Sequence, residues 1–544
     1  MRNISLIILF VIIYLSKPVF PQTNAADLII YNAKIYMLDD DFSISSAMAI
    51  KNGRILALGD DRILKDYDSE NLLDLNGKFV YPGFNDGHSH FLSYGISLTK
   101  YADLVGTRSF DAVVERLKEH DRSYPSKWVL GRGWDQNDWQ HKEFPDNSLL
   151  NEFFPDRPVV LTRIDGHAVI ANDYALKVAG INAATKIKGG EIILKNGRPS
   201  GVLVDNAAGL IKSTVPGFSE KEKSLALMKA QYNCFAAGLT TVSDAGLDKQ
   251  DILLIKRLQD NGKLKIKVYA MINPNKENFD YFYNIGPQHY DRLTVSAVKL
   301  YSDGALGSRG ALLLKPYSDD AGNYGLQMHT ESYFLEMCSK AYDAGFQVNT
   351  HAIGDSANRI MLKAYSEILR SRNDKRWRVE HAQIVSPDDI AYFKDFSIIP
   401  SVQATHSTSD MYWADERLGD ERLKSAYAYK NLMGQNGWLV NGTDFPIEDI
   451  SPLKTFFAAV IRKDVKGLPE NGFQIENALD RKDALRSITI WPAKGSFDEK
   501  EKGSLEKGKR ADFVVLDTDL IKAGEEQLLK AKVVSTYVDG EKVY

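Results

Sequence analysis

Cysteine is nearly absent from this chain of 544 residues, which contains only Cys234 and Cys338. Each lies in a separate helix-like stretch, so we expect two buried free thiols, and two cysteines so far apart cannot build a zinc–thiolate site. An excess of basic residues is also lacking, since the formal net charge is −4. The missing basic footprint argues against nucleic acid as a partner.

Long hydrophobic runs are scarce, and the one that bears on the location of the protein lies at the N-terminus. There Arg2 precedes an apolar stretch over residues 4–15, which is short for a membrane span and typical of a signal peptide. We expect residues 1–22 to be a signal peptide, with cleavage between Pro21 and Ala26. The mature protein is then expected to be periplasmic or extracellular, without membrane insertion. An uncleaved anchor is the alternative.

The remaining composition is that of a globular protein, with 44% hydrophobic and 26% charged residues. The first segments alternate strands with turns, and Asn-Gly pairs at 52–53 and 76–77 predict hairpins. The C-terminal segment, with an Asp-Gly pair at 539–540, has the same character. We therefore expect the two chain ends, residues 27–80 and 483–544, to form one small β-sandwich.

Between these ends, strand-like and helix-like segments alternate from residue 81 to 482. Amphipathic stretches such as 331–344 and 422–435 separate the strands, and several end next to a glycine that suits a helix C-cap. Eight such units with parallel strands predict an α/β fold, a (β/α)8 TIM barrel. The eight predicted strands are the one leading to His88 and those over 239–243, 264–272, 295–301, 346–350, 376–380, 397–402 and 437–441.

The first barrel unit is too long, because residues 95–216 separate its strand from the second one. This segment has strands of its own over 128–131, 158–163 and 191–204, the last with an Asn-Gly hairpin at 196–197. We interpret it as an insertion placed over the barrel mouth.

Metal-binding residue types stand where the predicted barrel strands end. His88 and His90 are two positions apart in a strand, so both imidazoles face the same side and can share one metal ion. Taken alone, this pair is equally well explained as two turn histidines. Barrel enzymes place their reacting groups at strand ends, and the other strands supply Lys299, His351, His381 and Asp444.

These residues and several longer motifs resemble the amidohydrolase superfamily over nearly the whole mature chain. The closer likeness is to the amidohydrolase 3 branch, which includes N-substituted formamide deformylase-like proteins. Residues 502–516 resemble that family's return to the sandwich. The other marks are Gly131-Arg-Gly-Trp-Asp135, Arg163-Ile-Asp-Gly-His-Ala168, Ser302-Asp-Gly-Ala-Leu-Gly-Ser-Arg309, and His406 followed by Asp410, Trp413 and Arg417-Leu-Gly419.

The resemblance implies a centre for two divalent metal ions, expected to be Zn²⁺. His88 and His90 would bind one ion, and the histidines that end the fifth and sixth strands would bind the other. Lys299 would bridge the ions as a carbamate derived from carbon dioxide, because a protonated lysine repels cations while a carbamate offers two oxygens. The alternative for Lys299 is an ordinary ion pair, for instance with Asp303, at a single-metal site.

The implied mechanism is hydrolysis by hydroxide, formed because a metal lowers the pKa of its bound water toward ~7. Asp444 would bind metal, take the proton of the attacking water and pass it to the leaving amine. His167 would polarise the substrate carbonyl or bind its oxygen, or else make a structural hydrogen bond. The other expected substrate contacts are Trp134 and Asp135, which suit a packed insertion core equally well, together with Arg309 and His406.

We therefore expect an exported, metal-dependent hydrolase acting on C–N amide-type bonds, such as those of N-acyl or N-formyl amines. Its expected partner is a small-molecule substrate, and whether the chain forms a homodimer stays open. Related barrels also cleave esters or catalyse isomerisation, so these activities remain alternatives. A secreted binding protein without catalysis is the alternative outside the enzymes, and the complete set of ligand residues argues against it.

Overall fold

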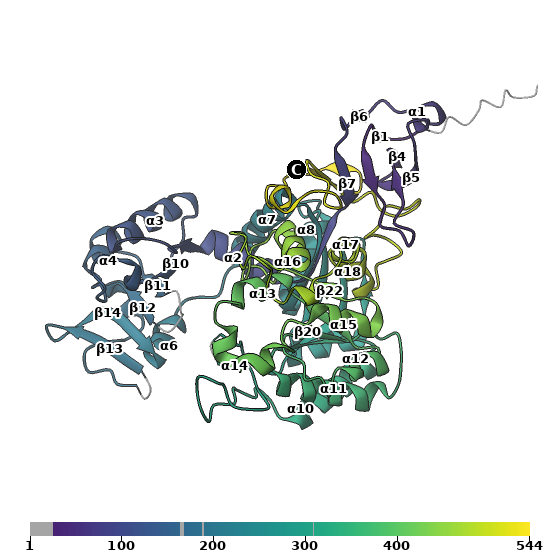
Figure 1. Ribbon diagram of the computed structural model, residues 1–544. Coiled ribbons are helices and arrows are strands. Elements are labelled where there is room, and N and C mark those ends of the chain that lie inside the picture. Colours follow the sequence, from purple (N-terminus) through teal and green to yellow (C-terminus); the bar gives the residue numbers. More distant parts are fainter. Residues whose placement is uncertain (1–24, 164–167, 188–189, 308) are drawn as a thin grey trace, which may run out of the picture.

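A (β/α)8 barrel forms the centre of the molecule, as predicted (Figure 1). The computed structural model describes residues 25–163, 168–187, 190–307 and 309–544, so the predicted signal peptide lies outside the described residues. Eight parallel strands follow one another in the order β8, β15, β16, β18, β19, β20, β21 and β22. Their bounds are Phe84–Ser89, Leu239–Leu247, Lys267–Ile272, Leu293–Tyr301, Gln347–Ala352, Arg378–His381, Ile399–Val402 and Val440–Asn441.

The barrel closes between its first and last strands through direct contacts. The Asp444 backbone N–H donates to the His88 carbonyl at 2.7 Å. Two residues earlier in β8, the Asp86 carboxylate accepts from the backbone N–H of Thr443 at 3.0 Å and from its hydroxyl at 2.7 Å. These bonds hold the end of β22 beside β8, so that predicted ligands from the two ends of the barrel sequence become neighbours.

Helices cover the outside of the barrel and begin and end at residues that suit caps. Ser219 caps α7 in a capping box with Glu222, and Gly437 ends α15 at a φ of 76°. The predicted helix over 422–435 is interrupted, because the irregular stretch 424–428 separates α14 from α15. The main barrel helices are α7 (Glu220–Ala236), α8 (Lys249–Asp260), α10 (Glu331–Asp343), α11 (Asp355–Leu369), α14 (Ala414–Leu423), α15 (Tyr429–Asn436) and α16 (Pro452–Ile461).

The two chain ends together form two small sheets (Figure 1). The first has the strand order β5-β4-β1-β6 and the second β25-β24-β23-β7-β2-β3. In the second, β7 from the N-terminal end pairs antiparallel with β23 from the C-terminal end. The bounds are β1 (Leu28–Tyr31), β2 (Lys34–Tyr36), β3 (Ile44–Ser45), β4 (Ala47–Lys51), β5 (Arg54–Gly59), β6 (Leu72–Asp74), β7 (Phe79–Pro82), β23 (Phe513–Leu516), β24 (Val533–Val538) and β25 (Glu541–Lys542).

Two of the three turn pairs in this region join hairpins. Asn52-Gly53 connects β4 with β5, and Asp539-Gly540 connects β24 with β25. Asn76-Gly77 instead connects β6 with β7, which lie in different sheets, so the hairpin prediction there is wrong. The C-terminal share of the sheets starts at β23, because residues from 483 onward first form helices, of which α18 (Ile490–Gly495) packs against β8 and β22.

A buried ion pair ties the barrel to the second sheet. Lys267, on β16, is only 2% exposed at its side chain and lies 2.7 Å from Asp512 and 3.0 Å from Asp539. Asp539 also pairs with Arg292 at 2.7 Å and with Arg510 at 3.1 Å. One lysine of a barrel strand therefore meets carboxylates that come from the last part of the chain.

The long segment after β8 forms a separate domain, the insert, with its own six-stranded sheet in the order β13-β14-β12-β11-β10-β9. Helices cover both faces of this sheet: Val159 and Leu161 of β11 pack toward α3 and α4, while Val160 packs toward α5 and α6. The bounds are β9 (Tyr101–Asp103), α3 (Phe110–Ser123), β10 (Val129–Trp134), α4 (Ser148–Phe153), β11 (Val159–Arg163), β12 (Ala168–Ala171), α5 (Asp173–Val178), β13 (Gly190–Lys195), β14 (Arg198–Asp205) and α6 (Asn206–Lys212).

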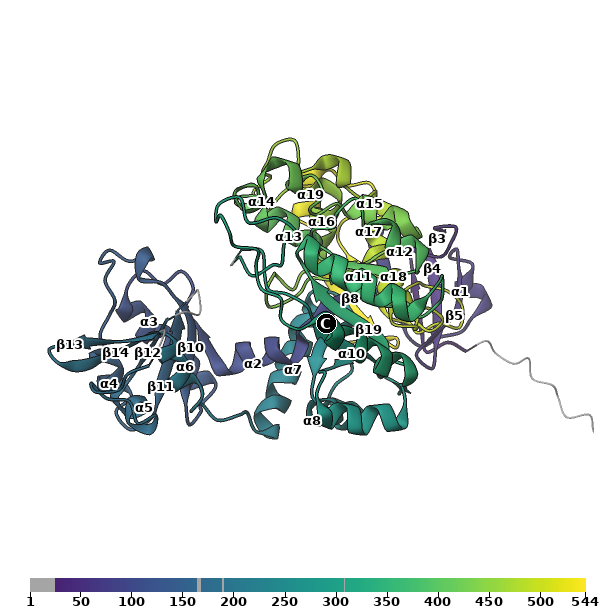
Figure 2. The ribbon, with the colours of Figure 1, turned by 90° about the horizontal axis from the view of Figure 1, so that it is seen from below.

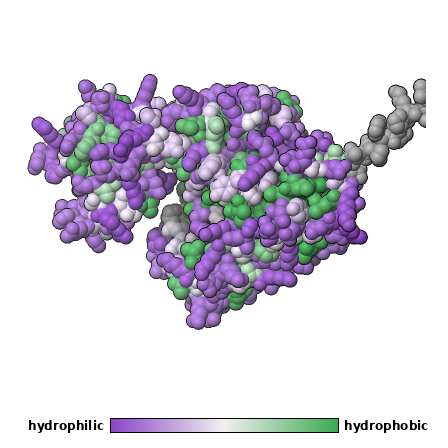
Figure 3. Space-filling model, turned by 90° about the horizontal axis from the view of Figure 1, so that it is seen from above, coloured by the Kyte–Doolittle hydropathy of each residue, from purple (hydrophilic) through white to green (hydrophobic). Residues whose placement is uncertain are grey.

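The insert forms a lobe of its own that is set off from the barrel (Figures 1 and 2). Helix α2 (Phe91–Lys100) starts directly after His90, packs along α7 and leads to β9. The space-filling view shows the insert as a lobe set off from the barrel by a notch (Figure 3). Over the described parts of the chain, no helix combines the length and the apolar character that crossing a membrane requires.

Candidate metal centre

The predicted ligands come together at the carboxyl ends of the barrel strands. Ligand atoms of His88, His381 and Asp444, all buried, lie within 4.8 Å of one another. Asp444 Oδ1 is 3.6 Å from His88 Nε2 and 3.2 Å from His90 Nε2. Three different strand ends, those of β8, β20 and β22, therefore converge on one carboxylate.

The two remaining ligands complete the ring of side chains. Lys299 Nζ, buried at the end of β18, lies 3.3 Å from His88 Nε2. The His351 ring lies 4.6 Å from the His381 ring, centroid to centroid. Asp303, the alternative partner of Lys299, instead accepts the backbone N–H groups of residues 312, 353 and 354. The structure thus brings all six predicted ligands to one place, and Asp303 borders them, with its Oδ1 3.4 Å from His351 Nε2.

Unusual backbone conformations aim two of these ligands. His381 and Asp444 have φ values of 72° and 61°, in the left-handed region that residues with a side chain rarely adopt. Such strain clusters at functional sites because the surroundings must hold it. The adjoining Gly442 permits the close approach of the strands, since a Cβ there would stand 2.4 Å from the His88 backbone nitrogen.

Burial sets the charges of the site. It lowers the pKa of His88 to about 4 and that of His381 well below its ordinary value, so both imidazoles are neutral and able to donate a lone pair. Burial also lowers the pKa of Lys299 to about 8. For Asp444 burial acts in the opposite direction, but the imidazoles around it, His90 first, hold its pKa well below its ordinary range.

Three polar atoms suggest what the site is built to hold. Within the described part of the chain, His351 Nε2, His406 Nε2 and Asp444 Oδ1 are buried without a well-directed hydrogen bond, although His351 Nε2 lies 3.4 Å from Asp303 Oδ1 and Asp444 Oδ1 lies 3.2 Å from His90 Nε2. Leaving such groups unsatisfied costs about 1–3 kcal/mol each. Neutral imidazoles and an ionised carboxylate are the donors that Zn²⁺ and similar divalent ions bind, so the residues present fit a metal.

Two histidines of the site have acceptors on their second ring nitrogen, and the sequence analysis overlooked both. His88 Nδ1 lies 2.5 Å from Glu380 Oε2, and His381 Nδ1 lies 2.7 Å from Gln403 Oε1. A signal was available for Glu380, because Arg378 and Glu380 place opposite charges two positions apart in a strand expected to be buried in the barrel. Gln403 carries no comparable signal.

Of the predicted substrate contacts, His406 lies at the centre. It belongs to α13 (Ala404–Asp410), its Nε2 lies 3.7 Å from Asp444 Oδ2, and its ring stacks on that of His381 at 5.9 Å. Arg309 is engaged elsewhere, since it pairs with Asp319 at 2.8 Å. The predicted His167 lies outside the described residues.

Trp134 and Asp135 belong to the insert, and both make contacts within it. Trp134 is fully buried in the cluster between the sheet and α3, and its indole N–H donates to the Leu161 carbonyl at 2.9 Å. A β-bulge between Arg132 and Trp134 shifts the strand alternation and turns the indole to that face. Asp135 forms an ion pair with Arg163 at 2.6 Å. The prediction that Trp134 lines a substrate pocket is therefore wrong.

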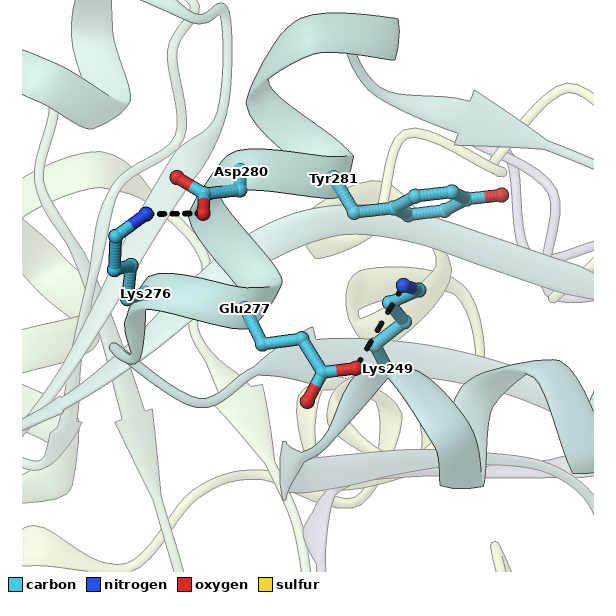
Figure 4. Close-up of a pocket in the computed structure, with 5 residues that line it drawn as sticks. All are labelled: Lys249, Lys276, Glu277, Asp280 and Tyr281. Atoms are coloured by element: carbon cyan, nitrogen blue, oxygen red, sulfur yellow. Dashed lines mark hydrogen bonds and ion pairs between the residues drawn. The ribbon is translucent and has the colours of Figure 1, made fainter.

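A surface pocket of about 520 Å³ lies apart from this centre, between the start of α8 and the segment after β16 (Figure 4). Its charges are used within it: Lys249 lies 3.6 Å from Glu277 and 4.7 Å from the centre of the Tyr281 ring, and Lys276 pairs with Asp280. None of the six predicted ligands lines it, so we assign it no part in the chemistry.

Comparisons with known proteins agree with this geometry. The profile of the amidohydrolase family matches residues 71–544. The chain is 32% identical to the protein LONG AFTER FAR-RED 3 of Arabidopsis thaliana, covering 96% of this chain and 92% of that protein. It is 31% identical to YtcJ of Bacillus subtilis (94% and 98%) and 28% identical to N-substituted formamide deformylase of Arthrobacter pascens (95% and 98%).

A solved structure gives the same result for the fold. A metal-dependent hydrolase from Pyrococcus horikoshii, whose function is uncharacterized, superposes with a TM-score of 0.78 at 30% identity. The match covers 92% of this chain and 99% of that one. A single superposition therefore includes the barrel, the sheets from both chain ends and the insert.

Proposed function

Because this chain belongs to the amidohydrolase family and is a metal-dependent hydrolase, we propose that it cleaves the C–N bond of N-acyl or N-formyl amines. The observation that carries this proposal is Asp444, an ionised carboxylate beside the neutral imidazoles of His88 and His381, with His90 Nε2 3.2 Å from its Oδ1. The formamide class is supported by the relative named N-substituted formamide deformylase.

We propose that the site would hold two Zn²⁺ ions, with His88 and His90 as ligands of one, His351 and His381 as ligands of the other, and Lys299 as a further ligand in the form of a carbamate. The lowered pKa of Lys299, about 8, supports the carbamate because only a neutral amine attacks carbon dioxide, forming an N–C bond and releasing one proton. When bound, the metal supplies a Lewis acid that polarises the carbonyl and acidifies the attacking water.

The residues of the chain handle the protons. Asp444 accepts a proton from the attacking water while the oxygen of that water bonds to the substrate carbonyl carbon. The same carboxyl then gives this proton to the amine nitrogen as the C–N bond breaks, so the carboxylate is restored. His406, 3.7 Å from Asp444 Oδ2, is placed to contact the substrate at the same face. The products are a carboxylic acid, or formic acid, and an amine.

The test is turnover of a panel of N-formyl and N-acyl amines by the D444N variant. General acid–base catalysis contributes about 10²–10⁴-fold, so we expect a loss of that size or greater, with most of the zinc retained. E448Q is the matched control, because Glu448 is a carboxylate of the same loop that bonds Ser409, and it should keep wild-type turnover. Normal turnover by D444N would refute the assignment.

A further inference from the structure

Strand β20 carries a buried pair of opposite charges directly before its metal ligand. Arg378 Nε lies 2.7 Å from Glu380 Oε1, and both side chains are completely buried. Removing two charges from water is expensive, and such a pair often contributes little net stability. Stability alone therefore does not explain why this ion pair is buried in the barrel core, which indicates a further role for it.

The other oxygen of Glu380 points to the metal centre. Glu380 Oε2 lies 2.5 Å from His88 Nδ1 and accepts the Ser401 hydroxyl at 2.6 Å. An ionised carboxylate can only accept, so His88 Nδ1 must carry the proton and donate it. The lone pair of His88 then resides on Nε2, the nitrogen that lies 3.3 Å from Lys299 Nζ and 3.6 Å from Asp444 Oδ1.

The arginine holds the same strand from its other side. Arg378 Nη2 donates to the Gly87 carbonyl at 3.2 Å, one residue before His88. The pair thus contacts β8 twice, once at its backbone and once at the imidazole ring. Arg378 therefore fixes one oxygen of Glu380, and the other oxygen lies on the His88 ring.

His381 provides a comparison within the same site. Its Nδ1 has an acceptor at 2.7 Å, but this acceptor is the neutral amide oxygen of Gln403. A carboxylate raises the basicity of a histidine ligand, as such partners do in metal sites generally. The two buried histidines therefore have the same arrangement but partners of different charge.

We propose that Glu380 is the positioning residue of His88, fixing its ring with Nε2 toward the metal and making it the stronger ligand of the two buried histidines. This inference rests on the proposed role of His88 as a metal ligand. It assigns Arg378 the task of holding the Glu380 carboxylate in place.

The experiment measures the zinc dissociation constant of purified, metal-stripped protein by competition with a chelator, for the wild type, E380Q and S401A. Replacing a partner of this kind costs about 10–100-fold in metal affinity, and we expect that loss in E380Q. S401A is the control, since it removes a neighbour of Glu380 but leaves the carboxylate, and its affinity should stay within about threefold. Far-UV circular dichroism of the metal-free variants checks the fold.

Wild-type zinc affinity in a folded E380Q would overturn the proposal, and so would an equal loss in S401A, because any disturbance of the network would then have the same effect. If E380Q leaves Arg378 unpaired and does not fold, R378M/E380Q removes both charges and must show the same loss of affinity. No substrate enters the measurement. A failure to cleave amides would therefore not affect the conclusion about Glu380. Likewise, unchanged zinc affinity in E380Q would not affect the proposed amide hydrolysis.

Discussion

Replacing Lys267 by methionine should loosen the attachment of the barrel to the C-terminal sheet. Methionine keeps most of the buried stem but removes the ammonium, which leaves Asp512, 4% exposed, without its counter-charge. Breaking a buried pair from one side costs about 3–5 kcal/mol. We expect the lower end, about 3 kcal/mol, because Asp539 keeps its contacts with Arg292 and Arg510.

This free energy converts into a small but measurable shift of the melting temperature. The entropy of unfolding is about 2.1 cal/mol/K per residue, hence about 1.1 kcal/mol/K for 544 residues, and the expected fall in Tm is about 3 °C by scanning calorimetry. K265M is the matched control, since Lys265 meets Glu541 at the surface and such pairs contribute about 1 kcal/mol at most. A fall below about 1 °C in K267M, or an equal fall in K265M, would refute the reasoning.

The same pair predicts a pH dependence. Burial acts to raise the pKa of Asp539, but Lys267 and the neighbouring arginines hold it well below its ordinary range. A carboxyl whose pKa is depressed on folding stabilises the protein fully above its unfolded pKa, ~3.9, and loses this contribution as the pH falls toward the folded value. The difference in Tm between the wild type and K267M should therefore be constant near neutrality and shrink below about pH 4.

Three further changes test the site and the insert. Under a fixed partial pressure of carbon dioxide, the initial rate of zinc uptake by metal-stripped protein should rise several-fold between about pH 6.5 and 7.5, because the pKa of Lys299 is lowered to about 8; a rate independent of carbon dioxide would contradict the carbamate. G442A should lose zinc because its Cβ would meet the His88 backbone, whereas G434A, with open space around it, should not; zinc is counted per chain. W134A should destabilise the insert by about 3–5 kcal/mol and speed its proteolysis while zinc content stays unchanged; lost zinc would contradict its place in the insert core.

The barrel and the clustering of its candidate ligands could be predicted because the signals are local. Each predicted ligand lies in or directly after the last part of a predicted strand, and parallel strands bring their carboxyl ends to one mouth. To predict that His88 and His90 share a site, only the two-residue period of a strand was needed. The convergence of Lys299 and Asp444 on them follows once the barrel is assumed, and the structure places all of them together.

What could not be predicted depends on contacts between distant segments. Glu380 and His88 are 292 positions apart, and no spacing rule links a carboxylate on one strand to an imidazole on another. Trp134 shows a different limit, since a single bulge in β10 decides which face of the sheet an aromatic residue enters. The strands of the insert are marked in the sequence, but the course of α2, which leads from the barrel to it, is not.

The closure of the barrel has a consequence for how the protein matures. Asp86 and Thr443, which join the first and last barrel strands, are 357 positions apart, and the insert must be synthesised and accommodated between them. Contacts of such long sequence separation form late, because the entropy of closing the chain must be met before they can form. His88 and Asp444 are held by this junction, so the metal centre comes into being only when the last strand docks. Zinc binding during refolding should accordingly report the completed barrel and lag behind the appearance of helix.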